Sequence, residues 1–187
     1  MRVYTPAELR RFLAGMDEAL EHPAEIVVIG GAAAAIEYGV ASGTSDIDTW
    51  TRVHADLAVA AERARQTTGL AVPFAQSGVA DGPHDFESRL ERVLPRLRRL
   101  RVSVPASIGT AQATQASVPE KHDLVLMKVL RGDEHDLQAI EAIHQRSPLD
   151  LSILLKRYQD EMSGAIIDPA RLRGQVLTMV ERLFPSD

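Results

Sequence analysis

Two aspartates separated by a single isoleucine are the residues of this sequence whose spacing most directly suggests a metal-binding or catalytic site. They close the stretch IVVIGGAAAAIEYGVASGTSDIDTW, which covers residues 26 to 50. In a β-strand, residues i and i+2 point to the same face, so Asp46 and Asp48 would present paired carboxylates while Ile47 faces the core. Paired carboxylates can share a divalent cation such as Mg²⁺, whose other ligands are usually water and substrate phosphates. The pair therefore predicts a magnesium site that serves a phosphate.

A glycine pair and two hydroxyl residues accompany the acids. Gly30 and Gly31 separate an apolar run from the segment AAAAIEYG, which favours a short helix. Because glycine has no Cβ, a phosphate can approach the backbone N–H groups at the positive end of such a helix. Thr44 and Ser45 add hydroxyl donors beside the acids. A dinucleotide-binding turn is the alternative, but GGAAAA lacks the GxGxxG spacing of that motif, so the combination favours a phosphate and metal site.

The elements that must position these residues alternate between helix and strand at first and are helical in the last third. Thr5, Pro6 and Glu8 form a capping-box signal that predicts a helix over residues 6–20. A second Ser-x-x-Glu signal at residues 117–120 predicts the start of the helical region. The expected fold class is α/β (α+β), a mixed sheet flanked by helices with a C-terminal helical bundle. The other expected elements are strands over 26–29, 46–51, 70–74, 85–94 and 99–104, the last two as a hairpin, and helices over 56–67 and within 121–132, 134–146, 149–162 and 170–184.

Length and composition set limits on the organisation and the location. With 187 residues, of which 45% are hydrophobic, the chain can bury a core as one domain or as one domain with a helical appendage. We expect an α/β core over residues 1–116 and a helical region over residues 117–187 that packs on it. The absence of cysteine excludes disulfides and thiolate zinc sites, so a metal must be held by oxygen or imidazole. No apolar run approaches the ~20 residues of a membrane helix, so we expect a cytoplasmic protein without a membrane partner.

The charge is unevenly spread along the chain. The formal net charge is −5, which argues against indiscriminate coating of nucleic acid. Residues 88–119 nevertheless carry six arginines, all between Arg89 and Arg101, against one glutamate. This Arg89–Arg101 segment could face phosphates, for example of RNA, or could be an ordinary solvated surface, and both interpretations stay open. Only Phe86 lies near it among aromatic residues, so base stacking is not indicated.

Two stretches of the sequence resemble a known family. IGGAAAAIEYGVASGTSDIDTW is similar to the signature of the DNA polymerase β-type nucleotidyltransferases, and more closely to that of AbiEii-type nucleotidyltransferase toxins and their uncharacterised bacterial relatives. KHDLVLMKVLRGDEHDLQAI resembles the later part of that pattern, in which a lysine-bearing helix precedes an aspartate in the next helix. The resemblance implies a nucleotidyltransferase-like sheet and Mg²⁺ (or Mn²⁺) as cofactor. Carried over by position, it assigns triphosphate binding to Gly30, Gly31 and Ser45, metal binding and catalysis to Asp46 and Asp48, phosphate binding to Lys128 and Arg131, and assistance of the acceptor to Asp136.

The implied activity is the transfer of a nucleotide from a nucleoside triphosphate to an RNA (tRNA-like) or protein acceptor. The chain would then be a candidate toxin of a toxin–antitoxin pair with a cognate antitoxin as partner. Many members of the superfamily carry a third carboxylate on a neighbouring strand, but no acid lies between Arg92 and Val118. Asp136 is the favoured third acid, with Glu87 and Glu91 as alternatives. A catalytically degenerate module with a binding or regulatory role is the alternative function.

Lys128 and Arg131 also have simpler interpretations. Lys128 lies within the apolar run LVLMKVL, where a structural lysine would extend its amine outward to solvent. Arg131 stands near a helix C-terminus, where a cation interacts favourably with the helix dipole. Contact with phosphate and these structural roles are therefore both open from the sequence.

Overall fold

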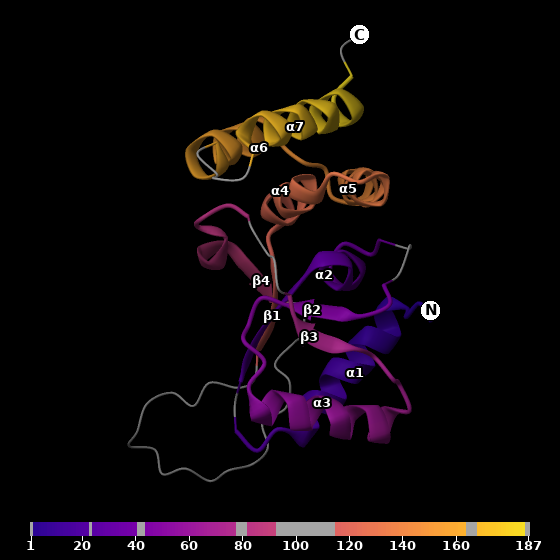
Figure 1. Cartoon of the computed structure of the whole chain (residues 1–187). Coiled ribbons are helices and arrows are strands. Elements are labelled where there is room, and N and C mark those ends of the chain that lie inside the picture. The colour runs from indigo at the N-terminus through magenta and orange to yellow at the C-terminus, as the bar shows by residue number, and fades with distance from the viewer. Residues whose placement is uncertain are drawn as a thin grey trace.

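A five-stranded mixed sheet lies at the centre of the protein in this computed structural model, which describes residues 2–22, 24–40, 44–77, 82–92, 115–163 and 168–185. Figure 1 shows α1 and α3 on one side of the sheet and α4 to α7 stacked on the other. The expected α/β fold class with its helical C-terminal part is confirmed. The elements are α1 Pro6–Ala19, β1 Glu25–Ile29, α2 Gly30–Ile36, β2 Ile47–Thr49, α3 Ala55–Thr68, β3 Phe74–Gln76, the 3₁₀ turn η1 Phe86–Arg89, β4 Leu90–Arg92, β5 Gln115–Pro119, α4 Lys121–Arg131, α5 Glu134–Arg146, α6 Leu151–Arg157, the π-helical turn η2 Tyr158–Met162 and α7 Pro169–Leu183.

The strand order is β3-β2-β1-β5-β4, with β1 at the centre. β1 pairs antiparallel with β2 and parallel with β5, while β2 and β3 are parallel and β4 and β5 antiparallel. Ile29 at the end of β1 stands opposite Asp48 in β2. The strand that carries Asp48 therefore lies beside the strand that leads into the glycine pair, as the sequence predicted.

Local signals explain why α1 forms and how it packs. The Thr5 hydroxyl accepts a hydrogen bond from the Glu8 N–H at 3.3 Å, and the Glu8 carboxylate accepts one from the Thr5 N–H at 2.9 Å. This reciprocal capping box confirms the predicted helix start. On the buried face, a Cβ on Gly15 would meet Thr68 Cγ2 at 3.0 Å and Ala64 Cβ at 3.4 Å. The small residues thus let α1 and α3 pack closely against the same face of the sheet.

The predicted capping box at residues 117–120 is wrong. Residues Ser117 to Pro119 belong to β5, and α4 begins only at Lys121, with Glu120 as its N-cap. The Ser-x-x-Glu spacing is a local signal, whereas β5 is fixed by pairing with β1 on one side and β4 on the other. The helical part of the chain therefore starts four residues later than residue 117.

Three other predicted strands are shifted or shortened. The strand expected over residues 46–51 lies at Ile47–Thr49, so Asp46 stands just before it. The strand expected over residues 70–74 lies at Phe74–Gln76. Of the strand expected over residues 85–94, Phe86–Arg89 form a 3₁₀ turn and only Leu90–Arg92 are extended. Its expected partner over residues 99–104 lies outside the described residues. Within the described part of the chain, β4 instead pairs with β5.

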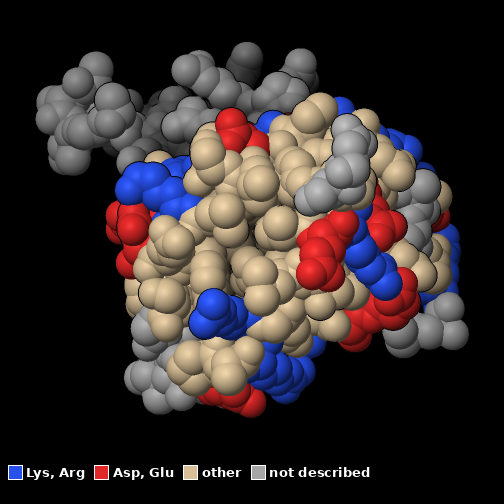
Figure 2. Space-filling view, turned by 90° about the horizontal axis from the view of Figure 1, so that it is seen from above, with Lys and Arg blue, Asp and Glu red and all other residues tan. Residues whose placement is uncertain are grey.

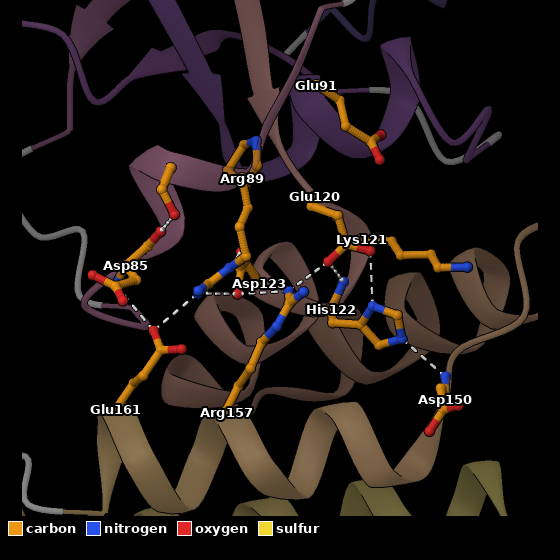
Figure 3. A network of polar contacts seen from close by, with 12 residues as sticks. Asp85, Arg89, Glu91, Glu120, Lys121, His122, Asp123, Asp150, Arg157 and Glu161 are labelled. Atoms are coloured by element: carbon orange, nitrogen blue, oxygen red, sulfur yellow. Dashed lines mark hydrogen bonds and ion pairs between the residues drawn. The ribbon is translucent and has the colours of Figure 1, made fainter.

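A buried ion-pair network, drawn in Figure 3, fixes the first half of α4 to η1 and to the α6–η2 segment. Asp123 of α4 is fully buried and accepts two hydrogen bonds from Arg89, at 2.7 Å from Nε and 3.0 Å from NH2. Arg157 of α6 lies 2.9 Å from the same carboxylate. Arg89 also donates to Glu161 at 2.9 Å. Asp123 thus joins three parts of the chain that are far apart in sequence.

Glu120 extends this network and predicts a stability that depends on pH. Burial raises the pKa of Glu120, but hydrogen bonds from His122 and Arg157 outweigh it and lower the pKa from 4.5 to about 2. A carboxyl whose pKa is lower in the folded state stabilises the fold fully above its unfolded pKa, and this contribution is lost as pH falls through the folded pKa.

We therefore expect the stability difference between the wild type and Glu120→Gln to be constant above about pH 6 and to shrink from about pH 5 downward. Urea denaturation of both proteins between about pH 7 and about pH 3 measures it. A difference that stays constant over the whole range would contradict the role given to the Glu120 charge.

Candidate active site

Asp48 and Gly30 face each other where β1 turns into α2. Gly30 is the first residue of α2 and has a φ of 66°, in the left-handed region that favours glycine. A Cβ at this position would lie 3.5 Å from Asp48 Oδ2. Glycine at residue 30 thus keeps the space beside the carboxylate open.

Asp46 and Asp48 influence each other electrostatically. Burial raises the pKa of Asp48, the neighbouring charge of Asp46 raises it further, and Arg131 acts in the opposite direction. Asp46 itself accepts a hydrogen bond from the Thr44 hydroxyl at 3.1 Å. Two carboxylates that repel each other in a half-buried place favour a cation between them, and their oxygens are the ligands that Mg²⁺ prefers. The pair therefore fits a hard divalent cation.

A third acid does not join this pair within the described residues. No group of three or more His, Asp or Glu side chains in that part of the chain is placed to hold a metal ion. β3, the neighbour of β2, places Ala75 opposite Asp48. Glu87 and Glu91, the alternatives considered from the sequence, accept hydrogen bonds from a tryptophan and a tyrosine. The described acidic cluster consists of two carboxylates.

An open cavity of about 200 Å³ brings the end of β1 and β2 together with α4 and α7. Figure 1 shows α4 above α2 and β2, with α7 beyond α4. The cavity combines one acid of the pair with cations from two helices and with an apolar lining. Its lining residues are Ile29, Gly30, Asp48, Ser77, Leu124, Met127, Lys128, Leu130, Arg131, Asp168, Arg171, Leu172 and Gln175.

The two cations contributed by α4 are held by one buried carboxylate. Asp136 of α5 is 1% exposed and accepts hydrogen bonds from Lys128 Nζ at 2.9 Å and from Arg131 NH2 and Nε at 2.8 and 2.9 Å. Burial raises the pKa of Asp136, but Arg131 and Lys128 outweigh it, so the net pKa is lowered. Lys128 is 3% exposed, so its amine does not extend outward to solvent. Arg131 stays 58% exposed on the side of the cavity.

The structure brings together most of the residues selected from the sequence. Four of them line the cavity, namely Gly30, Asp48, Lys128 and Arg131. Asp46 does not line it but acts electrostatically on Asp48, which does. Gly31 lies instead against the Thr44 hydroxyl, which a Cβ there would meet at 2.9 Å. Ser45 and Asp136 are not among the lining residues. The roles of all these residues in binding and catalysis stay predictions.

The contribution of α7 to the cavity was missed from the sequence. Arg171 and Gln175 stand four residues apart, so they share one face of α7. Both donate hydrogen bonds to the backbone carbonyl of Arg131, at 3.3 and 3.1 Å. Nothing in the local sequence of α7 indicates this, because the spacing is also that of an ordinary solvated face. Only the packing of α7 on α4 gives these side chains a place in the cavity.

The Arg89–Arg101 segment, for which the sequence predicts an RNA contact, is described only at its start. Arg89 is bound to Asp123 and Glu161, and residues 93–101 lie outside the described residues. Figure 2 shows the face that carries α6 and α7, where basic and acidic side chains are interspersed, in line with ion pairs such as Arg182–Glu134. RNA contact through the Arg89–Arg101 segment therefore stays a prediction.

The mixed sheet, the paired acids and the cations of α4 are compatible with a nucleotidyltransferase-like α+β fold. Comparison with protein families agrees, because a family model described as a nucleotidyltransferase of unknown function (DUF6036) matches residues 7–181. The chain belongs to this family. No curated protein and no solved structure matches it. In the described part of the chain, no helix has the length and apolar character needed to cross a membrane.

Proposed function

We propose that the protein is a magnesium-dependent nucleotidyltransferase of the DNA polymerase β type, similar to AbiEii-type toxins. It would transfer a nucleotide from a nucleoside triphosphate to a hydroxyl of an RNA (tRNA-like) or protein acceptor. The observation that carries this proposal is that Gly30, Asp48, Lys128 and Arg131 line a single cavity although they come from three separate elements. Membership of a nucleotidyltransferase family supports it.

Asp46 and Asp48 would hold the metal ion. Their oxygens suit Mg²⁺ or Mn²⁺, and a cation removes the repulsion that raises the pKa of Asp48. When bound, the ion neutralises charge on the triphosphate and helps to orient it. With two protein carboxylates, several coordination positions are left for phosphate oxygens and water.

The cations and the glycine turn would position the triphosphate. Lys128 and Arg131 supply fixed positive charge to the phosphates, and Gly30 allows their close approach. The acceptor hydroxyl oxygen then forms a bond to the α-phosphorus in line with the bond that breaks. Pyrophosphate leaves with the electrons of that bond, and the hydroxyl proton passes to solvent. Catalysis comes mainly from positioning and charge neutralisation.

Asp136 has a different place in this proposal from the acceptor role that the resemblance implies. Its carboxylate is buried and its two oxygens already bind Lys128 and Arg131. It would therefore be a positioning residue, which holds the two cations toward the cavity. A hydroxyl of the acceptor would have to displace one of these cations to reach it.

The experiment that tests the proposal is a transfer assay with the whole chain. The protein is incubated with each labelled nucleoside triphosphate, magnesium, and total cellular RNA or protein, and the products are separated by size. Label should enter a macromolecule, and chelation of the metal should prevent it. Growth arrest on induced expression, relieved by a co-expressed partner, would support the toxin role.

A binding or regulatory module is the second candidate, favoured by the two-carboxylate cluster of the described residues. Such a protein would bind nucleotide with magnesium but give no label transfer. Turnover therefore separates the two candidates, whereas binding alone does not.

Gly30 offers a prediction with a matched control in the same chain. Gly30 and Gly69 have nearly equal φ values of 66° and 67°, and a Cβ on Gly69 would meet nothing within 4 Å. Alanine at either position should cost about 1–2 kcal/mol of stability, since the backbone of both residues is in the left-handed conformation. Only Gly30→Ala should weaken binding of the magnesium triphosphate, by about tenfold or more, ~1.4 kcal/mol.

Thermal unfolding and calorimetric titration with a non-hydrolysable nucleotide measure the two effects. Equal nucleotide affinities of the Gly30 and Gly69 variants would remove the glycine turn from the binding site.

A further inference from the structure

The cavity extends beyond the charged residues that the proposed reaction uses. Apolar side chains of α4 and α7, namely Leu124, Met127, Leu130 and Leu172, line the same space as Asp48 and Lys128. A triphosphate does not need an apolar lining, whereas the flat faces of a nucleobase do. A bound nucleotide would therefore use the apolar lining for its base.

One polar side chain of α7 stands at the border of this region. Gln175 lines the cavity and also a neighbouring hollow next to Gly132 and Thr178. It is half-buried, and a Cβ on Gly132 would meet its amide at 2.2 Å. The amide is thus packed over the end of α4 at a defined position.

The end of α4 also fixes which way the amide of Gln175 points. The last carbonyls of a helix have no partner inside the helix, and that of Arg131 accepts a hydrogen bond from Gln175 Nε2 at 3.1 Å. A carbonyl can only accept, so the reversed amide would set two acceptors against each other. The NH₂ group of Gln175 is therefore committed to Arg131, and Oε1 points elsewhere.

Oε1 of Gln175 is an acceptor without a hydrogen bond to any described residue. No buried side-chain nitrogen or oxygen in the described part of the chain lacks a hydrogen-bond partner. Oε1 is therefore not sealed inside the protein, and Gln175 lines the cavity in which a ligand would sit. The lining offers this ligand an acceptor, to which a donor binds and a carbonyl does not.

We propose that Gln175 selects the base of the bound nucleotide and that Oε1 accepts a hydrogen bond from the amino group at C6 of adenine or at C4 of cytosine. The inference rests on the proposed function. At these positions guanine and uracil carry a carbonyl, and the amino group of guanine is at C2, on the other side of the ring edge. The protein then prefers ATP or CTP over GTP and UTP, because a carbonyl there would leave two acceptors facing each other.

The test compares the binding of ATP, CTP, GTP and UTP, each with magnesium, by calorimetric titration in the absence of acceptor. Inorganic tripolyphosphate with magnesium is the probe for the phosphate site alone. We expect ATP or CTP to bind about tenfold more tightly than GTP and UTP. This ratio corresponds to one hydrogen bond that contributes ~1.4 kcal/mol to the binding free energy. Gln175→Met keeps the length but removes the acceptor, so this ratio should fall to about one while the tripolyphosphate affinity is unchanged.

Two control variants separate base selection from a purely structural role. Arg171→Met also removes a donor to the carbonyl of Arg131, and it should keep the base ratio even if stability falls. Thr178→Val changes a residue that lines only the neighbouring hollow. It should leave both the base ratio and the tripolyphosphate affinity unchanged. A ratio of one in the wild type, a preference for GTP or UTP, or an unchanged ratio in Gln175→Met would overturn the inference and leave the proposed function standing. Absence of binding by every nucleotide and by tripolyphosphate would overturn both.

Discussion

Replacing Asp48 by asparagine should reduce nucleotide transfer by on the order of 10²–10³-fold while the fold survives. The amide keeps the size of the side chain but removes a charge that the metal needs. Stability without metal should stay equal or rise, because burial and the charge of Asp46 both disfavour the ionised Asp48 carboxylate. Label transfer at saturating magnesium and thermal unfolding without metal are the two measurements.

Asp46→Asn should behave in the same way, since the two acids share one ion in the proposal. Asp160→Asn is the matched control, because it makes the same chemical change in an exposed ion pair with Lys156. It should keep full transfer. Full transfer by the Asp46 and Asp48 variants would mean that the protein is not a magnesium-dependent transferase of the proposed kind.

Asp136→Asn distinguishes the two roles considered for that residue. If Asp136 assists the acceptor, transfer should be lost while nucleotide binding largely remains. If it positions Lys128 and Arg131, nucleotide binding should fall as well, since both cations lose the carboxylate that holds them. The ratio of the two losses, measured on one preparation, decides between the roles.

The largest loss of stability is expected for Asp123→Asn, by about 3–5 kcal/mol. The variant leaves Arg89 and Arg157 beside a neutral amide in a place where Asp123 is fully buried. Removing one partner of a buried ion pair is costly because the remaining charges lose compensation, and Arg89 and Arg157 would then have only Glu161 and Glu120 as partners in the described part of the chain. Urea denaturation at neutral pH measures the change in the free energy of unfolding.

Asp160→Asn is again the matched control, since the exposed ion pair of Asp160 with Lys156 should contribute only about 0–1 kcal/mol to stability. A double variant, Asp123→Leu with Arg89→Met, should recover part of the loss, because it replaces charges by apolar groups of similar size. If Asp123→Asn were as stable as the Asp160 variant, the network would have no role in holding α4.

Features encoded by neighbouring residues were predictable from the sequence. The capping box of α1 and the turn from β1 into α2 at Gly30 both depend on residues within one turn of each other. The pairing of β2, which carries Asp48, with β1 agrees with the tendency of strands that follow each other in the chain to be neighbours in the sheet. The same local reasoning failed at β5, because Ser117 and Glu120 imitate a helix start while distant strands decide the conformation.

The residues of the candidate site also differ in whether the local sequence could indicate them. Asp48 and Lys128 could be selected because paired acids and a lysine in an apolar run are unusual in themselves. Arg171 and Gln175 could not, since each is an ordinary polar residue until α7 packs on α4. The ion pairs of Asp136 also depend on how α5 folds back along α4, which residue spacing does not determine.

The two buried carboxylates of α4 and α5 have a consequence for motion. Asp123 ties the start of α4 to η1 and α6, and Asp136 ties its end to α5, so the helix is anchored at both ends. Its central amides should therefore exchange with deuterium only on global unfolding. α7 adds a buried apolar face, which includes Leu172, Val176 and Met179, and the exposed Arg171 reaches the end of α4. Lys128 and Arg131 should therefore keep the same position whether the cavity is empty or occupied, because they project from a helix that is fixed at both ends.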